Sequence, residues 1–252
     1  MKIRKLWRAL RRYLIGVQVA LTTPRTVQMI RHVLRQGWTY LDEAALYEVA
    51  QQIVKLEGTQ QSGILIEAGC ALGGSALVIA QAKARQRPFY LYDAFGMIPP
   101  PSTHDEADAH QRYAEIAAGR AQGINGQAYY GYESNLQVKV RANFVTCGLE
   151  PAAHAVHFVP GFYEKTLWVD QPVAFAHLDC DWHDSVLICL QRITPHLVPG
   201  GVLIIDDYND WSGCKRAVDT YFAALKTQFI FTMGERLHIC KKQGCNGRDT
   251  DR

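Results

Sequence analysis

The chain has 252 residues and a mass of 28.3 kDa, which suits one large α/β domain or two small domains. Apolar residues make up 48% of it and charged residues 20%, proportions that exclude wholesale disorder and a fibrous repeat. No uncharged apolar run reaches the roughly 18 residues that a membrane-spanning helix needs. The seven cysteines form no Cys-x-x-Cys pair, which argues against a disulfide scaffold and a cysteine-based zinc site and favours a cytoplasmic protein.

Positive charge is concentrated at the start of the chain. Residues 1–41 contain nine Lys and Arg but no Asp or Glu, so the rest of the chain is net acidic, which argues against nucleic-acid binding. Apolar residues at helical spacing within residues 1–20, with basic residues between them, predict a basic amphipathic helix. Three roles stay open for it: packing on its own domain or on a second copy in a homodimer, peripheral contact with an anionic membrane, and a targeting peptide.

The remaining elements alternate in a regular way. Residues 26–57 predict two helices, so residues 1–57 form a helical extension ahead of a main domain at 58–243, and residues 244–252 form a polar tail. Five buried-type strands are predicted at Ile64–Ala68, Phe89–Tyr92, Val156–Val159, Val173–Leu178 and Gly201–Ile205. Helices are predicted at Ser75–Ala84, Ser134–Cys147, Ser185–His196 and Arg216–Lys226, and a hairpin at Phe229–Thr232 and Leu237–Cys240. This order predicts an α/β fold: a doubly wound, Rossmann-like sheet of about seven strands with a C-terminal antiparallel hairpin.

The connection between the second and third predicted strands is much longer than the other connections. Residues 94–155 separate the second strand from the third, and such a crossover usually needs far fewer residues. The segment holds a run of three prolines, a His- and Asp-rich stretch and three closely spaced tyrosines. Long ordered insertions beside a ligand crevice often serve as lids or substrate walls, so we expect this role here. The alternative is a surface loop that has no functional role.

The first strand runs into a glycine-rich turn that follows an acidic residue. The candidate cofactor-binding residues in this turn are Glu67, Gly69, Gly73, Gly74 and Ser75. Their spacing fits neither a Walker loop nor Gly-x-Gly-x-x-Gly, and an acid ahead of Gly-x-x-x-Gly-Gly is typical of S-adenosylmethionine binding. The glycines let a ligand lie against bare backbone, and the helix amino terminus adds N–H donors. Asp93, which ends the second strand, could accept hydrogen bonds from both ribose hydroxyls, or could merely cap a turn.

Three aspartates follow two strands that should be neighbours. Asp179 follows the fourth strand, and Asp206 and Asp207 follow the fifth. The carboxyl ends of parallel strands meet at one edge of a sheet, where ligands bind. Carboxylates gathered there repel one another unless a cation is present, and oxygen-only ligands suit Mg²⁺. We therefore predict a Mg²⁺ site, with Asp179 also bordering the cofactor, although helix or turn caps are the alternative.

Two residues at the same edge are candidates for a general base. Asp181 lies two residues beyond Asp179 and would face the same side in an extended segment. His183 is also nearby, and the sequence does not choose between the two. Asp184 is expected to cap the helix that follows.

Five stretches together carry a resemblance to a known family. Residues 67–75, 93–99, 156–167, 177–181 and 199–208 resemble, in order, the macrocin O-methyltransferases, which act on sugar hydroxyls of secondary metabolites. The resemblance spans roughly residues 38–240. It implies S-adenosylmethionine as methyl donor, Mg²⁺ held by Asp179, Asp206 and Asp207, and a small-molecule or glycan acceptor that presents two vicinal oxygens.

The chain departs from the family pattern at three places, one of which is the poorly matched, Pro-, His- and Asp-rich region 94–155. Cys70, Ala71 and Leu72 stand where the family usually has a bulky residue and an arginine, and Trp182-His183 stands where a tyrosine is common. These differences bear on the acceptor more than on the fold or the cofactor. A metal-independent small-molecule methyltransferase and a catalytically silent scaffold that binds S-adenosylmethionine remain alternatives.

Overall fold

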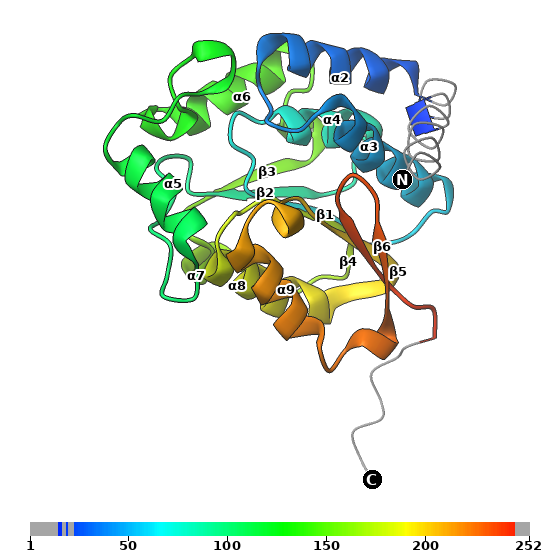
Figure 1. Ribbon diagram of the computed structural model, residues 1–252. Coiled ribbons are helices and arrows are strands. Elements are labelled where there is room, and N and C mark those ends of the chain that lie inside the picture. Colours follow the sequence, from blue (N-terminus) through cyan, green and yellow to red (C-terminus); the bar gives the residue numbers. More distant parts are fainter. Residues whose placement is uncertain (1–14, 17–18, 20–22, 245–252) are drawn as a thin grey trace, which may run out of the picture.

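The computed structural model describes residues 15–16, 19 and 23–244 (Figure 1). Most of the predicted basic helix at 1–20 and nearly all of the tail at 244–252 therefore lie outside the described residues, and their roles stay predictions. Ile15 and Val19 are helical and buried, and both belong to the apolar cluster that α2 (Pro24–Gln36) and α3 (Glu43–Gly58) form with the sheet. This end of the extension thus packs on its own domain. The domain boundary near residue 58 also stays a prediction.

A seven-stranded sheet forms the centre of the molecule. Its strands are β1 (Ile64–Ala68), β2 (Phe89–Asp93), β3 (Val156–Pro160), β4 (Val173–Leu178), β5 (Leu197–Ile205), β6 (Phe229–Met233) and β7 (Leu237–Lys241), in the spatial order β3-β2-β1-β4-β5-β7-β6. Strands β1 to β5 are parallel, whereas β7 pairs antiparallel with β5 on one side and with β6, which precedes it in the chain, on the other. The predicted doubly wound α/β sheet with a C-terminal antiparallel hairpin is confirmed.

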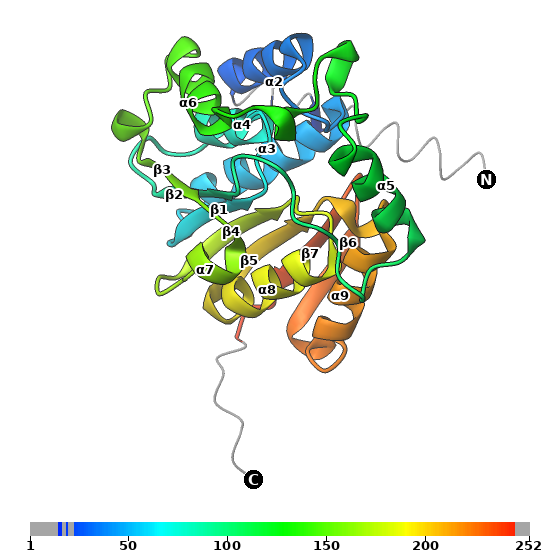
Figure 2. The ribbon, with the colours of Figure 1, turned by 90° about the vertical axis from the view of Figure 1, so that its left-hand side faces the viewer.

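Helices cover both faces of this sheet (Figures 1 and 2). One face carries α2, α3, α4 (Gly74–Ala82) and α6 (Leu136–Thr146), and the other carries α7 (Tyr163–Thr166), α8 (His183–Ile193) and α9 (Ser212–Phe222). Each layer buries an apolar cluster against the strands, as expected for strands that are apolar on both faces. The carboxyl ends of the parallel strands are left free for a site.

The insertion at 94–155 folds back over that edge of the sheet (Figure 2). Besides the predicted α6, it forms α5 (Ala107–Ala117) and three short 3₁₀ turns at Ile124–Gly126, Tyr130–Tyr132 and Ala152–His154. Helix α5 was not predicted, because only Ala109 and Ile116 of it are buried and its sequence lacks a continuous apolar stripe. Helix α5 lies against α9, so the insertion reaches across the edge of the sheet.

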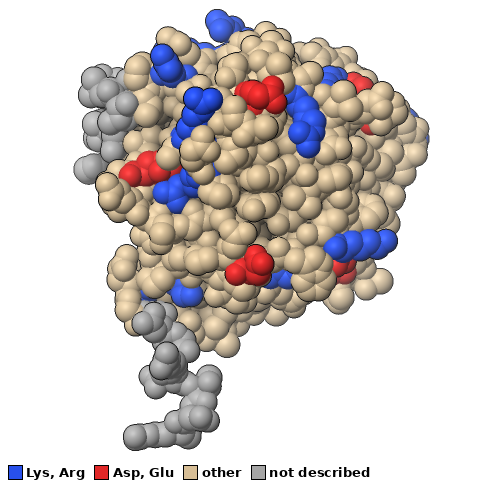
Figure 3. Space-filling view, turned by 180° about the vertical axis from the view of Figure 1, so that it is seen from behind, with Lys and Arg blue, Asp and Glu red and all other residues tan. Residues whose placement is uncertain are grey.

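The face opposite to that of Figure 1 carries charges of both signs. Among the described residues there, separate Lys and Arg side chains and separate Asp and Glu side chains are scattered over a mostly uncharged surface (Figure 3). Within the described ranges, no helix is both long enough and apolar enough to span a membrane.

Candidate active site

The glycine turn after β1 is held by a carboxylate of the neighbouring strand. Gly69 has φ of +86°, and a Cβ there would overlap the carbonyl oxygen of Asp179, so only glycine fits. Asp93 Oδ2 accepts hydrogen bonds from the backbone N–H groups of Cys70 (2.8 Å) and Ala71 (3.1 Å), and its Oδ1 accepts one from Phe95 N–H (2.7 Å). Burial raises the pKa of Asp93 although these donors oppose the shift. Asp93 thus shapes the turn that the sequence predicts to hold the cofactor.

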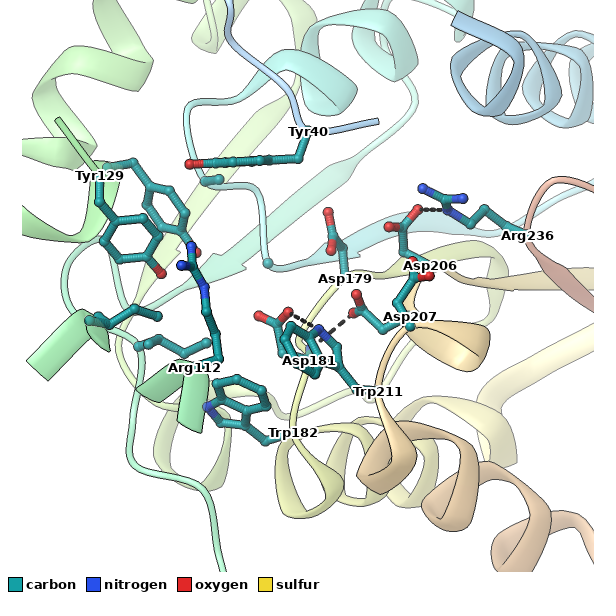
Figure 4. Close-up of a pocket in the computed structure, with 16 residues that line it drawn as sticks. Tyr40, Arg112, Tyr129, Asp179, Asp181, Trp182, Asp206, Asp207, Trp211 and Arg236 are labelled. Carbon is teal, nitrogen blue, oxygen red and sulfur yellow. Dashed lines mark hydrogen bonds and ion pairs between the residues drawn. The ribbon is translucent and has the colours of Figure 1, made fainter. Parts of the chain in front are cut away.

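Asp179, Asp206 and Asp207 converge at the ends of β4 and β5, as predicted (Figure 4). One carboxylate oxygen from each lies within 4.8 Å of the others. Burial and the neighbouring carboxylates raise the pKa of Asp179 and of Asp207 well above the ordinary value. Mutual repulsion of this kind is what a bound cation relieves, and an all-oxygen donor set suits Mg²⁺. The residues present therefore fit this metal.

Asp206 differs from its two neighbours because it has cationic partners. Arg236 Nε donates to Asp206 Oδ1 at 2.6 Å, and His177 Nε2 lies 3.7 Å from the same oxygen. Burial alone would raise the pKa of Asp206, but His177 and Arg236 lower it. This carboxylate stays ionised without a metal.

Asp181 faces the same carboxylates from a strained backbone position. Its φ is +55°, and its N–H donates to Asp207 Oδ2 at 3.0 Å. Trp211 Nε1 donates to Asp181 Oδ1 at 2.8 Å (Figure 4). Burial raises the pKa of Asp181 to about 6. A carboxylate held in this way is ionised near neutral pH and can accept a proton.

These acids line a cavity of about 270 Å³ whose other walls are mainly aromatic (Figure 4). Side chains from several distant segments contribute, namely Tyr40, Arg112, Tyr129, Tyr130, Trp182, Trp211 and Arg236. A second, narrower cavity lies against Asp93 and Gly161 and shares Gly69, Asp179 and Asp181 with the first. Sequence reasoning missed these wall residues, apart from the tyrosine cluster of the insertion, because they come together only in the folded chain.

Some predicted site residues lie elsewhere. Glu67 is fully buried and its Oε1 contacts His177 Nδ1 at 2.9 Å, so it lines neither cavity. Gly73, Gly74 and Ser75 begin α4 behind the turn and also lie outside both linings.

His183 and Asp184 contact each other outside the two cavities. His183 Nδ1 lies 2.7 Å from Asp184 Oδ1, and neither residue lines these two cavities. The capping prediction for Asp184 is wrong: Trp182 is the N-cap residue of α8, and Asp105 Oδ1 of the insertion accepts the His183 N–H at 2.8 Å. The insertion occupies the capping position because it crosses the amino terminus of this helix.

Comparison with known proteins agrees with this arrangement. The model of the macrocin-O-methyltransferase (TylF) family matches residues 30–230. The chain belongs to this family. The match covers the whole sheet up to the start of the last hairpin, together with the insertion and all five aspartates of the site.

Two curated relatives of this macrocin-O-methyltransferase family protein are enzymes of Streptomyces. The 8-demethyl-8-(2,3-dimethoxy-alpha-L-rhamnosyl)-tetracenomycin-C 4'-O-methyltransferase of Streptomyces olivaceus is 32% identical over 166 residues, which is 63% of this chain and 58% of the relative. The demethyldecarbamoylnovobiocin O-methyltransferase of Streptomyces niveus is 27% identical over 187 residues, 71% of this chain and 65% of the relative. The chain thus spans less than two thirds of either relative.

Solved structures support the fold of this family member. The O-methyltransferase NovP superposes with a TM-score of 0.67 at 23% identity over 81% of each chain. The apo structure of CalS11, described as a TDP-rhamnose 3'-O-methyltransferase, superposes with a TM-score of 0.53 at 13% identity over 93% of this chain and 94% of the other.

Proposed function

We propose that the protein is an S-adenosylmethionine-dependent O-methyltransferase that acts on a hydroxyl group of a sugar-containing small molecule. The observation that carries the proposal is the convergence of Asp179, Asp206 and Asp207 beside Asp181, in a cavity that reaches the glycine turn at Gly69. Family membership supports the methyl transfer, and the names of the two Streptomyces relatives support a sugar-bearing acceptor.

The cofactor would lie in the narrower cavity, against Gly69 and Asp93. Bound there, S-adenosylmethionine supplies an electrophilic methyl group on a sulfonium. The Asp93 carboxylate lies on the second strand end, where an acid can accept hydrogen bonds from ribose hydroxyls. Gly69 lines this cavity, and its missing side chain lets the backbone of Asp179 lie against the turn, which brings the end of β4 beside the cofactor. Gly73, Gly74 and Ser75 would support this turn from the start of α4.

The metal would be held by Asp179, Asp206 and Asp207. When bound, Mg²⁺ polarises an acceptor hydroxyl and lowers its pKa. Mg²⁺ fills the positions that the three carboxylates leave with water or substrate oxygens, so an acceptor with two vicinal hydroxyls would suit this site.

Asp181 is the base in this proposal. Its carboxylate accepts the hydroxyl proton, while the oxygen's electron pair forms the new bond to the methyl carbon and the sulfur leaves as a neutral thioether. Trp211 fixes one oxygen of Asp181 by its 2.8 Å hydrogen bond, which leaves the other oxygen for the proton. Tyr40 and Trp182 wall the cavity and limit the access of water.

Calorimetry and a transfer assay test the proposal. S-adenosylhomocysteine should bind the purified protein at micromolar concentration. An aryl rhamnoside with free vicinal hydroxyls should be methylated in the presence of Mg²⁺, and its monodeoxy analogue should not. Chelation or Asp179→Asn should lower the rate at least about a hundredfold, whereas Asp219→Asn, which changes an exposed carboxylate of α9, should not.

The outcomes separate the alternatives. A rate that survives chelation would point to a metal-independent methyltransferase. Binding of S-adenosylhomocysteine without transfer to any hydroxyl would point to a silent scaffold, and absence of binding at millimolar ligand would overturn the proposal.

A further inference from the structure

A second group of metal-ligating side chains lies outside the carboxylate site. His104 of the insertion meets His183 and Asp184 of α8, which are about eighty residues away in the sequence. Asp184 Oδ1 lies 3.0 Å from His104 Nδ1 and 2.7 Å from His183 Nδ1. One ligand atom from each of the three lies within 4.8 Å of the others, and none of the three residues lines either cavity of the candidate active site.

The donor set differs in kind from the aspartate triad. Two imidazole nitrogens and one carboxylate oxygen suit a borderline cation such as Zn²⁺, whereas Mg²⁺ prefers oxygen alone. Ligands about 2.0–2.2 Å from a tetrahedral Zn²⁺ lie about 3.3–3.6 Å apart, so the two short contacts would widen by about 0.3–0.9 Å, which side-chain rotation can supply. The side chains of His104 and Asp184 are 61% and 50% exposed, so the cluster is open to solvent and a water can take the fourth position.

We propose that His104, His183 and Asp184 form a Zn²⁺ site that joins the insertion to α8. The proposal is independent of the methyl-transfer reaction, because it rests on ligands that lie outside both cavities. Its chemistry is coordination only: both histidines bind in the neutral form and Asp184 binds as a carboxylate.

The position of this site gives it a structural consequence. A segment of the insertion, residues 99–108, which we call the strap, crosses the amino termini of α8 and α9. The Pro99 carbonyl accepts a hydrogen bond from Trp182 Nε1 (2.9 Å), and Asp108 accepts hydrogen bonds from the N–H (2.9 Å) and hydroxyl (2.8 Å) of Ser212. His104 lies between these two attachments. A metal there ties the strap to α8 next to Trp182, which walls the proposed acceptor cavity.

A hydrogen-bonded cluster without metal is the competing explanation. Asp184 Oδ1 can accept an N–H hydrogen bond from each ring, because each neutral imidazole can carry its proton on Nδ1. The ring centroids of His104 and His183 are 4.8 Å apart, which suits either explanation. The two explanations differ in one prediction: only the Zn²⁺ site predicts that the protein binds Zn²⁺ and that replacing a ligand weakens this binding.

The test is a Zn²⁺ titration of the full-length, tag-free protein, stripped with chelator and held in excess Mg²⁺ to occupy the aspartates. The wild-type chain should bind one Zn²⁺ with a micromolar Kd, and His104→Ala should weaken binding about tenfold or more. His110→Ala, which removes another exposed histidine of the insertion, is the matched control and should bind as the wild type does. Asp179→Asn should also retain the Zn²⁺, because the two sites share no ligand.

Co²⁺ provides a second readout that does not depend on activity. Co²⁺ in the same site should give visible absorption bands that are lost in His104→Ala and kept in His110→Ala. Zn²⁺ binding of equal strength in the wild type and His104→Ala would overturn the proposal, as would binding lost in Asp179→Asn instead. Absence of binding at about 100 µM Zn²⁺ would leave the hydrogen-bonded cluster as the explanation.

Discussion

Replacing Gly69 by alanine should damage the fold and the candidate site together. At φ of +86°, the added Cβ would overlap the carbonyl oxygen of Asp179 and lie 2.7 Å from its carbonyl carbon. Both atoms belong to the backbone, so no side chain can rotate to relieve the contact. Either the turn after β1 or the end of β4 must move, and the latter carries a proposed metal ligand.

A second glycine, Gly119, separates the cost of a left-handed backbone from the cost of steric overlap. Gly119 also has positive φ, +71°, but a Cβ there meets nothing within 4 Å. Gly119→Ala therefore carries only the left-handed backbone cost of about 1–2 kcal/mol. Gly69→Ala carries the same cost plus that of overpacking, about 3 kcal/mol, because backbone atoms cannot yield easily. In a chain of this size about 1 kcal/mol lowers Tm by about 2–4 °C, so Gly69→Ala should melt about 6–12 °C below Gly119→Ala.

Thermal unfolding followed by circular dichroism measures this difference, and calorimetry with S-adenosylhomocysteine measures the damage to the site. Gly119→Ala should bind the ligand as the wild type does, whereas Gly69→Ala should bind it more weakly. If the two variants melt within about 2 °C of each other, or if Gly69→Ala binds the ligand normally, the close approach of Gly69 to Asp179 is not a constraint and the reasoning fails.

Three further predictions concern the base, its support and the buried thiols. Asp181→Asn should lower kcat by about 10²–10⁴ in the transfer assay while the acceptor KM changes little, and a rate within about twofold of wild type would exclude it as the base. Trp211→Phe keeps the ring but loses the donor to Asp181, so kcat should fall about tenfold with Tm almost unchanged; an equal loss of Tm would mean a structural role. Burial raises the pKa of Cys70 and Cys214 well above that of a free thiol, so the folded state keeps protons that the unfolded state loses. The free energy of unfolding should therefore fall as pH rises above about 9, by about 1.4 kcal/mol per pH unit for each thiol. When this free energy is measured by urea unfolding at several pH values, its fall with pH should be about 1.4 kcal/mol per pH unit smaller in Cys214→Ala than in the wild type; an equal fall in both would refute this.

The strands were predictable because each is a short apolar run between turn-forming residues. Strand β4 has the predicted bounds, Val173–Leu178, because both of its faces are buried and every residue in it is apolar or paired. Strand β5 begins four residues earlier than predicted, at Leu197. Pro199 and the two glycines after it indicate a turn, yet Leu197 still pairs with Val173 across a register shift, so pairing with β4 overrides the local signal.

The site was predictable only where topology fixes it. Residues that end parallel strands must meet at one edge, so the sequence alone places Asp179, Asp206 and Asp207 together. Tyr40, Arg112 and Trp211 reach the cavity through the packing of the extension, the insertion and the start of α9, and no short-range pattern encodes that packing. The sequence places Glu67 beside the cofactor and gives no sign of its contact with His177, because a strand pattern predicts which face a side chain takes but not which partner it contacts there.

His177, the partner of Glu67, explains how five acids can lie at one edge of the sheet. Burial alone would lower the pKa of His177, but its interactions with Asp206 and Glu67 raise it to about 10, so it is a cation within the sheet. Glu67 balances this charge from β1, and Arg236 adds a second cation beside Asp206. Asp206 is therefore neutralised by the protein itself and stays ionised, whereas burial, and then repulsion from the neighbouring carboxylates, raise the pKa of Asp179 and of Asp207. The acid ahead of the glycine turn thus supports a proposed metal ligand through His177, and a divalent cation at the cavity would relieve the repulsion among the other carboxylates.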